Sequence, residues 1–259
     1  MILTKLHNPD NGPMQVVGLM SGSGSNLRKI LELEKNLKAE QGTSPFTVVA
    51  LFTDNAQSNA TKIGKEFDLP VVVRDIGAFY AARSKPRRDI EARRVFDTMT
   101  VHALAPYQAT VAAYAGYMSI VTTPLIKAFL GANVHPADLV IKEGDRRKYT
   151  GDNAVRDAIL ARETQLRSSM HIVEEKVDYG KILMRSAPLQ IILPEGFDPN
   201  DEDLVTRVAQ EHQERLKQVG DWEIFPKTLL YMAEGRYARD AQGNLYFDGS
   251  PIPQGLSLG

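Results

Sequence analysis

A short apolar run that ends in a cluster of glycines and serines constrains the fold of this chain most strongly. Residues 16–20 are apolar enough for a buried strand, and they stop at the small polar residues 21–26. The pattern that follows predicts a strand, a tight loop and a helix in that order, the first unit of many α/β sheets. The apolar residues at helical spacing are Leu27, Ile30, Leu31 and Leu37.

The same alternation continues over the first half of the chain. Strands that alternate with helices form right-handed crossovers and a mostly parallel sheet. The predicted fold class is therefore α/β, with a mostly parallel twisted sheet and helices on both faces. We expect strands near residues 46–52, 71–73, 109–114 and 133–135, and helices near 60–67, 92–103 and 124–130.

The later part of the chain has a different pattern. Segments 168–173 and 182–189 are typical of a strand pair, and 201–217 and 225–232 of two helices. Residues 236–247 are typical of a hairpin. These elements predict antiparallel additions in the C-terminal third of a single domain over residues 1–259.

Charge and composition exclude several classes of protein. The 259 residues carry 31 Lys and Arg against 32 Asp and Glu, which argues against a general nucleic-acid or membrane-surface binder. There is no cysteine, so disulfides, thiolate metal sites and a cysteine nucleophile are excluded. No stretch approaches about 18 apolar residues, and the polar residues 1–13 do not resemble a signal peptide. We expect a cytoplasmic protein that is a monomer or a homodimer.

The loop after the first strand is the first candidate binding site. Its glycines let a ligand approach the backbone, and the helix that follows offers free N–H groups to an anion such as phosphate. It is not a Walker loop, because no Gly-Lys-Ser/Thr follows, and it lacks the third glycine of a dinucleotide fingerprint. The alternative is a simple capped turn. The loop residues are Gly22, Ser23, Gly24, Ser25 and Asn26.

Polar side chains also stand near the ends of later strands. Asn133 and His135 are two residues apart at a predicted strand end, so both point to the same side. Asp178 lies where the chain turns between two strands. The alternatives are a satisfied turn for the first two and an ordinary hairpin aspartate for the third. His171 alternates with apolar residues and is expected to be buried and hydrogen-bonded, and no spacing of His, Asp and Glu indicates a metal site.

Six motifs in the same order resemble the folate-dependent formyltransferase family over about residues 15–255. The resemblance implies a Rossmann-like formyltransferase fold, with a nucleotide-binding-like half at 15–135 and a folate-site half with a C-terminal hairpin at 136–259. Asp178, Tyr179 and Gly180 resemble the family's Asp-Gly-Gly. The motifs are Ser21 to Leu27, Ala115 to Met118, Asn133 to Pro136, Lys148 to Gly151, Ser169 to Val173 and Asp178 to Gly180.

The resemblance also implies roles for individual residues. The catalytic residues carry over to Asn133, His135 and Asp178, with Asp178 keeping His135 protonated so that it donates to the reacting oxygen. The implied ligands are a phosphorylated amine and 10-formyltetrahydrofolate as co-substrate, without a metal. Substrate binding carries over to the glycine-rich loop, Arg88, Pro136 and Asp221, with Glu211 as the alternative to Asp221. Folate binding carries over to Met118, Ser119, Ile120, Val121, Glu174, Glu175, Lys176 and Val177.

The end of the chain indicates a branch of the family. Residues 234–236 and 247–255 resemble the terminal hairpin and tail of the branch that formylates glycinamide ribonucleotide in purine synthesis. The chain departs from the family at residues 137–140, in the longer segment 142–147, and in an apparent insertion at 213–220. Asn153 stands where a histidine is expected, and Ser119 where an arginine is expected. These departures keep three alternatives open: another amine such as an amino sugar, hydrolysis of the formyl-folate, or a non-catalytic binding protein.

Overall fold

An eight-stranded sheet forms the centre of the molecule. The computed structural model describes residues 2–259, so Met1, the first residue of the predicted domain, lies outside the described residues. The strand order is β16-β11-β10-β6-β5-β2-β3-β4. The strands are β2 (Met14–Met20), β3 (Phe46–Thr53), β4 (Val71–Val73), β5 (Val111–Tyr114), β6 (Leu130–His135), β10 (Ser169–Ile172), β11 (Ile182–Arg185) and β16 (Leu256–Ser257).

The directions of the strands agree with the predicted mixed sheet. The neighbours from β4 to β6 are parallel, whereas β10 runs antiparallel to both β6 and β11. The predicted strand pair and hairpin are confirmed. The hairpin strands β13 (Tyr237–Arg239) and β14 (Leu245–Phe247) lie between β1 (Thr4–Lys5) and β15 (Ser250–Pro251). Two small pairs are β7 (Lys142–Glu143) with β8 (Arg146–Arg147), and β9 (Gln165–Leu166) with β12 (Leu189–Gln190).

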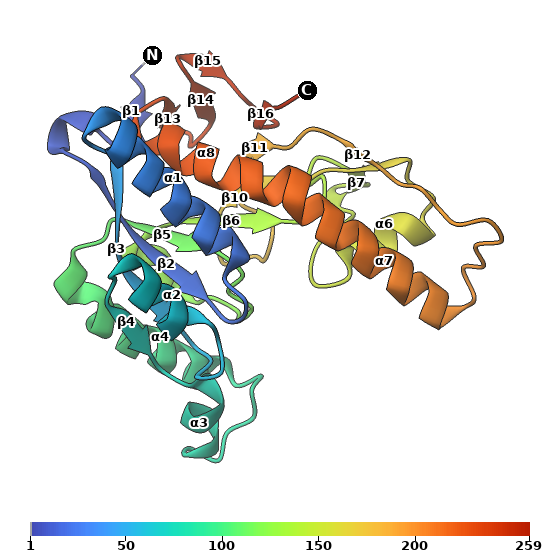
Figure 1. The fold of residues 1–259 in the computed structure, drawn as a ribbon, viewed down its shortest axis with the longest axis horizontal. Helices are drawn as coiled ribbons and strands as arrows, with labels where there is room; N and C mark the ends of the chain where they lie inside the picture. The colour runs from blue at the N-terminus through green and yellow to red at the C-terminus, as the bar shows by residue number, and fades with distance from the viewer. Residues whose placement is uncertain (1) are drawn as a thin grey trace.

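Helices cover both faces of the sheet, as predicted. Strand β2 shows why: Val16 and Met20 join one buried cluster, whereas Val17 and Leu19 join another on the opposite face. A central parallel strand is buried on both sides and therefore needs an apolar run rather than alternation. Figure 1 shows α1 and α8 side by side on the first face. The first cluster includes α1 (Ser25–Gln41), α2 (Ala60–Phe67) and α8 (Trp222–Ala233), and the second includes α3 (Ile76–Ala81), α4 (Ile90–Leu104) and α5 (Thr123–Ala128).

The two helices predicted at 201–217 and 225–232 form one continuous helical stretch. Helix α7 (Glu202–Leu216) passes into a π-helical turn (Lys217–Asp221) and then directly into α8. The expected break was wrong. Gly220 lies inside the π turn, where a Cβ would lie 2.6 Å from Ser168 Oγ, so the glycine serves a close approach and does not end the helix. The apolar side of α7 packs on α6 (Ala154–Leu160) in a third, smaller cluster.

Elements of the first half match the predictions closely. Helix α2 and strand β4 occupy the predicted residues, and α4 stops at Leu104 before a 3₁₀ turn that contains Pro106. The short helix α3 was not predicted. Within residues 2–259, no helix combines the length and the apolar character needed to cross a bilayer.

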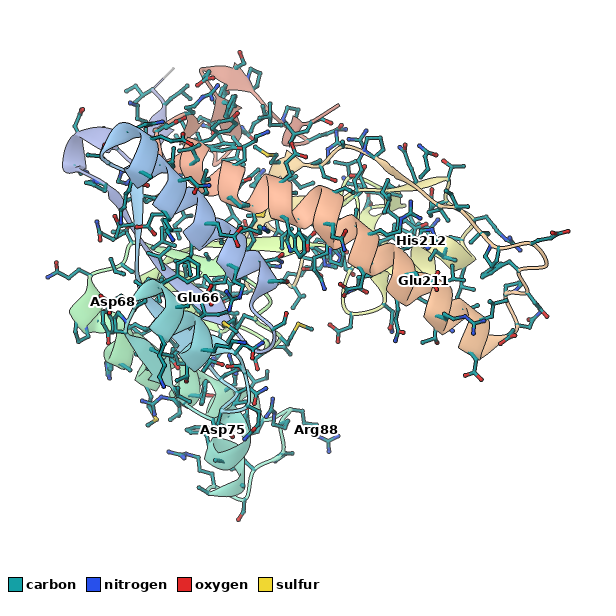
Figure 2. All side chains as sticks on the ribbon, in the orientation of Figure 1. Glu66, Asp68, Asp75, Arg88, Glu211 and His212 are labelled. Carbon is teal, nitrogen blue, oxygen red and sulfur yellow. The ribbon has the colours of Figure 1, made fainter. Side chains whose placement is uncertain are left out.

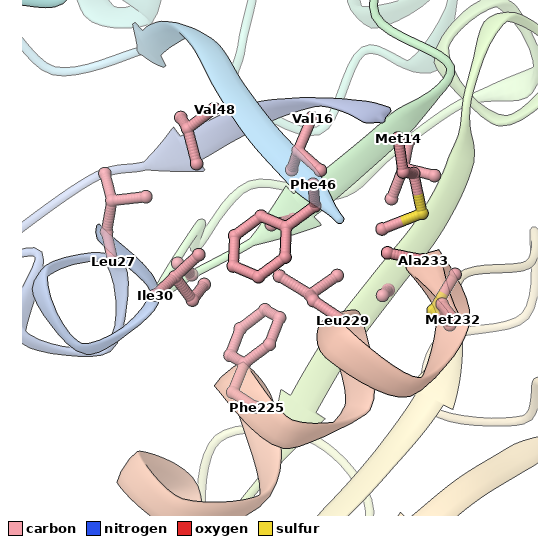
Figure 3. Close-up of a cluster of buried hydrophobic side chains, with 14 of the residues drawn as sticks. Met14, Val16, Leu27, Ile30, Phe46, Val48, Phe225, Leu229, Met232 and Ala233 are labelled. Atoms are coloured by element: carbon pink, nitrogen blue, oxygen red, sulfur yellow. The ribbon is translucent and has the colours of Figure 1, made fainter. Parts of the chain in front are cut away.

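Two phenylalanines join α8 to the sheet. Phe46 of β3 and Phe225 of α8 face each other in the first cluster, and neither has exposed surface (Figure 3). Phe225→Ala is expected to lower the free energy of unfolding by about 3–5 kcal/mol, because neighbouring side chains refill the space only in part. Urea unfolding measures the loss. Val95→Ala on the exposed side of α4 is the control, and a loss for Phe225→Ala below about 1 kcal/mol would contradict this role of the cluster.

Candidate active site

A cavity of about 650 Å³ opens at the carboxyl ends of β2, β5 and β6. Because neighbouring parallel strands end at the same edge of the sheet, the loops that follow them line one crevice. The loop after β10 and the π turn complete the lining. The cavity brings together most of the predicted residues: Gly22, Ser23, Gly24, Ser25, Asn26, Met118, Ser119, Ile120, Val121, Asn133, His135, Pro136, Glu174, Val177, Asp178 and Asp221.

Arg88, predicted to bind the substrate, does not line this cavity. Asp89 caps α4, so Arg88 remains outside the helix in an exposed loop, and Figure 2 shows its side chain beside α3, directed outward. The arginine that turns inward is Arg93. It is buried, pairs with Asp97 at 3.0 Å and donates to the hydroxyl of Tyr117 at 2.8 Å. The charge-rich segment therefore supplies one interior ion pair, and Arg88 remains on the surface.

The glycine-rich loop is shaped for close approach. Gly24 precedes α1 with φ +72°, and a Cβ there would meet Ile63 Cδ1 at 2.5 Å and Met20 Cε at 2.8 Å. A Cβ at Gly22 would meet no atom within 4 Å, so this glycine faces open space. No side chain caps α1, which leaves the N–H groups of its first turn available to an anion.

Asn133, His135, His171 and Asp178 form one polar cluster in the cavity. The register of β6 and β10 places Asn133 opposite His171, and Asn133 Nδ2 lies 3.1 Å from His171 Nε2. The two oxygens of Asp178 lie 3.5 Å from His135 Nδ1 and 3.4 Å from His171 Nε2. The predicted burial and hydrogen bonding of His171 are confirmed. Its contact with Asn133 and Asp178 was not foreseen.

The ring of His135 is held between two acceptors. Burial lowers the pKa of His135, and the negative charge of Asp178 offsets only part of this effect. Burial thus opposes the protonated form of His135 that the resemblance implies, and Asp178 favours that form. In the neutral ring, Nε2–H donates to the carbonyl oxygen of Tyr149 at 3.0 Å, which leaves Nδ1 facing Asp178 and able to accept a proton.

Asp178 is ionised over the whole physiological range. Burial acts to raise its pKa, but a hydrogen bond from His171, the charge of His135 and the N–H of Gly151 together lower the pKa to about 2. The N–H of Gly151 donates to Asp178 Oδ2 at 2.9 Å. Within residues 2–259, no group of three or more His, Asp and Glu side chains is arranged to hold a metal ion.

Asp221 comes from the π turn and lies beside the glycine-rich loop. Its carboxylate accepts from Ser168 Oγ at 2.5 Å and from Asn26 Nδ2 at 3.4 Å. Burial raises the pKa of Asp221 to about 6, although both hydrogen bonds act to lower it. Glu211, the alternative, is exposed on α7 and does not line the cavity (Figure 2).

The mouth of the cavity is apolar. Met118, Ile120 and Val177 are more than half exposed there, at 71%, 56% and 52%.

Asp54 joins two walls of the cavity. Its carboxylate accepts from the hydroxyl of Ser21 at 2.6 Å and from the hydroxyl of Ser119 at 2.5 Å.

Two residues predicted for the folate pocket lie beside the cavity rather than in its wall. Glu175 accepts from Thr123 Oγ1 at 2.6 Å, and Lys176 Nζ lies 3.3 Å from the centre of the Tyr179 ring. These contacts turn both side chains toward the protein. Within the segment 174–177, Glu174 and Val177 reach the cavity.

Several lining or supporting residues were missed from the sequence. Asp54 follows β3 as a strand-end residue, so the rule that found Asn133 could have found it. Gln213 and Lys217 line the cavity from the helical stretch that was expected to be an insertion, and no motif marks them. The carbonyl of Tyr149 has no sequence signature.

Asp221 gives a pH-dependent prediction. Its pKa is raised from 3.8 to about 6 on folding, so its ionisation costs stability progressively between about pH 4 and pH 6. Asp221→Asn keeps an acceptor for Ser168 without the charge. It is expected to raise the free energy of unfolding at pH 7 by up to about 3 kcal/mol and to have little effect below about pH 4. Urea unfolding of the wild type and the variant across this pH range measures the change. A difference in the free energy of unfolding that does not depend on pH would contradict the burial of an ionised Asp221.

The chain is similar to known proteins in family, sequence and structure. A family model described as formyl transferase matches residues 14–219. The phosphoribosylglycinamide formyltransferase of Escherichia coli is 25% identical over 243 residues, covering 93% of this chain and 96% of that protein. The enzyme of the same name from Haemophilus influenzae is 24% identical over 242 residues, with the same two shares covered.

Solved structures share the fold. The phosphoribosylglycinamide formyltransferase from Coxiella burnetii aligns with a TM-score of 0.67 at 24% identity, covering 95% of this chain and all of that one. Glycinamide ribonucleotide transformylase 1 from Symbiobacterium toebii aligns with a TM-score of 0.65 at 24% identity, covering 91% and 94%. The family match spans most of the chain and includes the glycine-rich loop and the cluster of Asn133, His135 and Asp178. The chain therefore belongs to the formyl transferase family.

Proposed function

We propose that this protein transfers the formyl group of 10-formyltetrahydrofolate to the amine of glycinamide ribonucleotide, a step of de novo purine synthesis. The bacterial relatives are named for this substrate and align over almost their whole length. The observation that carries the proposal is one cavity that joins the glycine-rich loop, an apolar mouth, and the cluster of Asn133, His135 and Asp178. Such a cavity can hold a phosphorylated amine and a folate with their reacting atoms at one place.

The two ends of the cavity suit the two ligands. The phosphate of the ribonucleotide would bind at the loop 22–26, where the start of α1 offers uncapped N–H groups to an anion. The folate ring system would lie against the apolar side chains of Met118, Ile120 and Val177. The reacting amine and formyl group would then meet between these sites, at Asn133.

The attack creates a charge that Asn133 can stabilise. The amine nitrogen adds to the formyl carbon, and negative charge develops on the formyl oxygen. The Asn133 amide carries two N–H groups, and Nδ2 lies 3.1 Å from His171 Nε2, so whichever way His171 is protonated, at least one N–H is available to donate to this oxygen. A donor placed where charge develops is worth roughly 3 kcal/mol in the transition state.

The His135–Asp178 pair would move the proton. Because His135 is neutral before the reaction, it can accept the proton that the amine loses, directly or through a water molecule. Asp178 Oδ2, 3.5 Å from Nδ1, then stabilises the imidazolium. The bond between the formyl carbon and N10 of the folate breaks, N10 takes the proton, and the products are the formylated amine and tetrahydrofolate.

The direct test compares folate turnover with and without the acceptor amine. Purified protein is incubated with 10-formyltetrahydrofolate alone, with glycinamide ribonucleotide, and with an amino sugar. Release of tetrahydrofolate that requires the ribonucleotide supports the proposal. Equal release without any amine would show a hydrolase, and release only with the amino sugar would show a different acceptor.

Asp178→Asn tests the proton-transfer step. We expect turnover to fall by a factor of about 100 or more, as for loss of a positioned proton-transfer group, with both ligands still bound. His135→Ala should do similar harm, and the double variant should be little worse than either, because residues that act as a unit are not additive. Steady-state kinetics and folate titration measure this, with the exposed Asp145→Asn as control. Fully additive losses would contradict the paired role.

Two glycines of the loop give opposite expectations. A Cβ at Gly22 would meet no protein atom within 4 Å, so Gly22→Val should fold normally and raise the KM for the ribonucleotide about tenfold or more, a loss of about 1.4 kcal/mol of binding. Gly24→Ala should instead lower the melting temperature, because φ +72° and the contacts with Ile63 and Met20 oppose a Cβ. If the first variant has a normal KM, the loop is only a turn and does not bind phosphate.

A further inference from the structure

A short hairpin and the segment after it lie against the catalytic cluster. Strands β7 and β8 pair with each other, and the chain continues through residues 148–151. In this continuation, the carbonyl of Tyr149 faces His135 Nε2 at 3.0 Å, and the N–H of Gly151 donates to Asp178 Oδ2 at 2.9 Å. One segment therefore contacts both members of the His135–Asp178 pair.

Arg147, the last residue of β8, holds the backbone of the loop that carries Asp178. Its Nη1 donates to the carbonyl of Asp178, and its Nη2 donates to the carbonyl of Gly180 at 2.9 Å. The backbone N–H of Arg147 donates to the Tyr179 hydroxyl at 3.2 Å, and the guanidinium lies 5.6 Å from the centre of that ring. A planar guanidinium can bond both carbonyls at once, a geometry that a lysine ammonium does not reproduce.

Asp178 needs this support because its backbone conformation is unfavourable. Its φ of +58° lies in the left-handed region, which residues other than glycine adopt uncommonly. A residue keeps such a conformation only where surrounding contacts hold it there. The same conformation directs the carboxylate at His135 and His171, at 3.5 and 3.4 Å. Release of the loop would therefore withdraw the carboxylate from both rings.

Tyr179 makes two contacts with Arg147 beside Asp178. Its hydroxyl accepts from the Arg147 N–H at 3.2 Å, and its ring lies beside the guanidinium. A glycine there would have no hydroxyl to accept from Arg147 and no ring for the guanidinium to cover.

We propose that Arg147 is a positioning residue for the reaction: through the carbonyls of Asp178 and Gly180, it holds the Asp178 carboxylate at His135. Arg147 does not line the cavity, so it acts through Asp178 rather than on the substrate. The kinetic consequence of this role rests on the proposed function, whereas the structural consequence does not.

Three variants of the whole chain test the role by kinetics. Arg147→Met removes both donors, Arg147→Lys keeps the charge on a single donor group, and Arg146→Met is the control because Arg146 is exposed on the same strand. Arg147→Met should lower kcat about 10- to 100-fold, the loss typical of a misplacement of about 1 Å, with the KM for the amine within about twofold. Arg147→Lys should recover part of kcat. Arg146→Met should change neither constant.

A second measurement does not depend on turnover. The pKa of the His135 imidazole is followed by NMR in the wild type, in Asp178→Asn, in Arg147→Met and in the double variant. Asp178→Asn should lower the pKa of His135, because an opposite charge nearby favours the imidazolium. If Arg147 holds that carboxylate in place, Asp178→Asn should lower the pKa of His135 much less in Arg147→Met than in the wild type. Such a difference measures the coupling between Arg147 and Asp178.

The outcomes separate this role from the proposed function. A wild-type protein that transfers no formyl group contradicts the proposed function, and the imidazole titrations still decide the role of Arg147. Two results would overturn the role of Arg147. One is an equal effect of Asp178→Asn on the pKa of His135 in both backgrounds, and the other is kinetics of Arg147→Met that match those of Arg146→Met. If Arg147→Met does not fold, Arg147→Lys, which keeps the charge and most of the volume, decides the matter by the same two measurements.

Discussion

The antiparallel pairing of β10 with β6 is the contact on which the rest of the site depends. Strand β6 is the last of the parallel neighbours that begin at β4, and β10 runs back beside it in a register that sets His171 opposite Asn133. The loop from β10 to β11 then brings Asp178 to both histidines. Antiparallel neighbours can be joined by a short connection, and residues 173–181, which carry Asp178, are that connection between β10 and β11. The change of direction thus assembles polar groups from two strands and a loop at the end of a sheet that is otherwise apolar.

Burial acts to raise the pKa of two carboxylates in this cavity, Asp178 and Asp221, but the two differ in their hydrogen-bonding and charged partners. Asp178 receives a histidine hydrogen bond, a backbone N–H and the charge of a second histidine, and its pKa falls to about 2. Asp221 receives one hydroxyl and one amide, and burial prevails, so its pKa rises to about 6. Environments that separate the pKa values of two acids commonly separate their roles. One carboxylate remains a permanent anion beside the histidines, and the other joins the π turn to the glycine-rich loop through Asn26.

The parallel half was largely predictable because its signals are strong and local. Apolar runs bounded by turn residues placed α2 and β4 at their observed residues, and the strand-end rule together with the family resemblance led to Asn133, His135 and Asp178. Contacts that depend on register or on the backbone could not be predicted. Alternation marks His171 as buried but does not show which strand lies beside it. A run of charges likewise does not reveal that Arg93 turns inward while Arg88 stays in solvent.

The π turn between α7 and α8 has a consequence for how the chain tolerates changes in length. A π turn contains one more residue than an α-helical turn. This extra residue sets the direction in which the apolar faces of α7 and α8 point, so that each helix packs against its own partner. Helix α7 keeps Val208 and Leu216 on the smaller cluster, while α8 keeps Phe225 and Leu229 on the sheet. Removing one residue from Lys217–Asp221 would rotate one helix against the other by about 100°, and one of the two interfaces would lose its apolar face. The number of residues in this turn therefore fixes how the outer helix and the sheet-bound helix are rotated relative to each other.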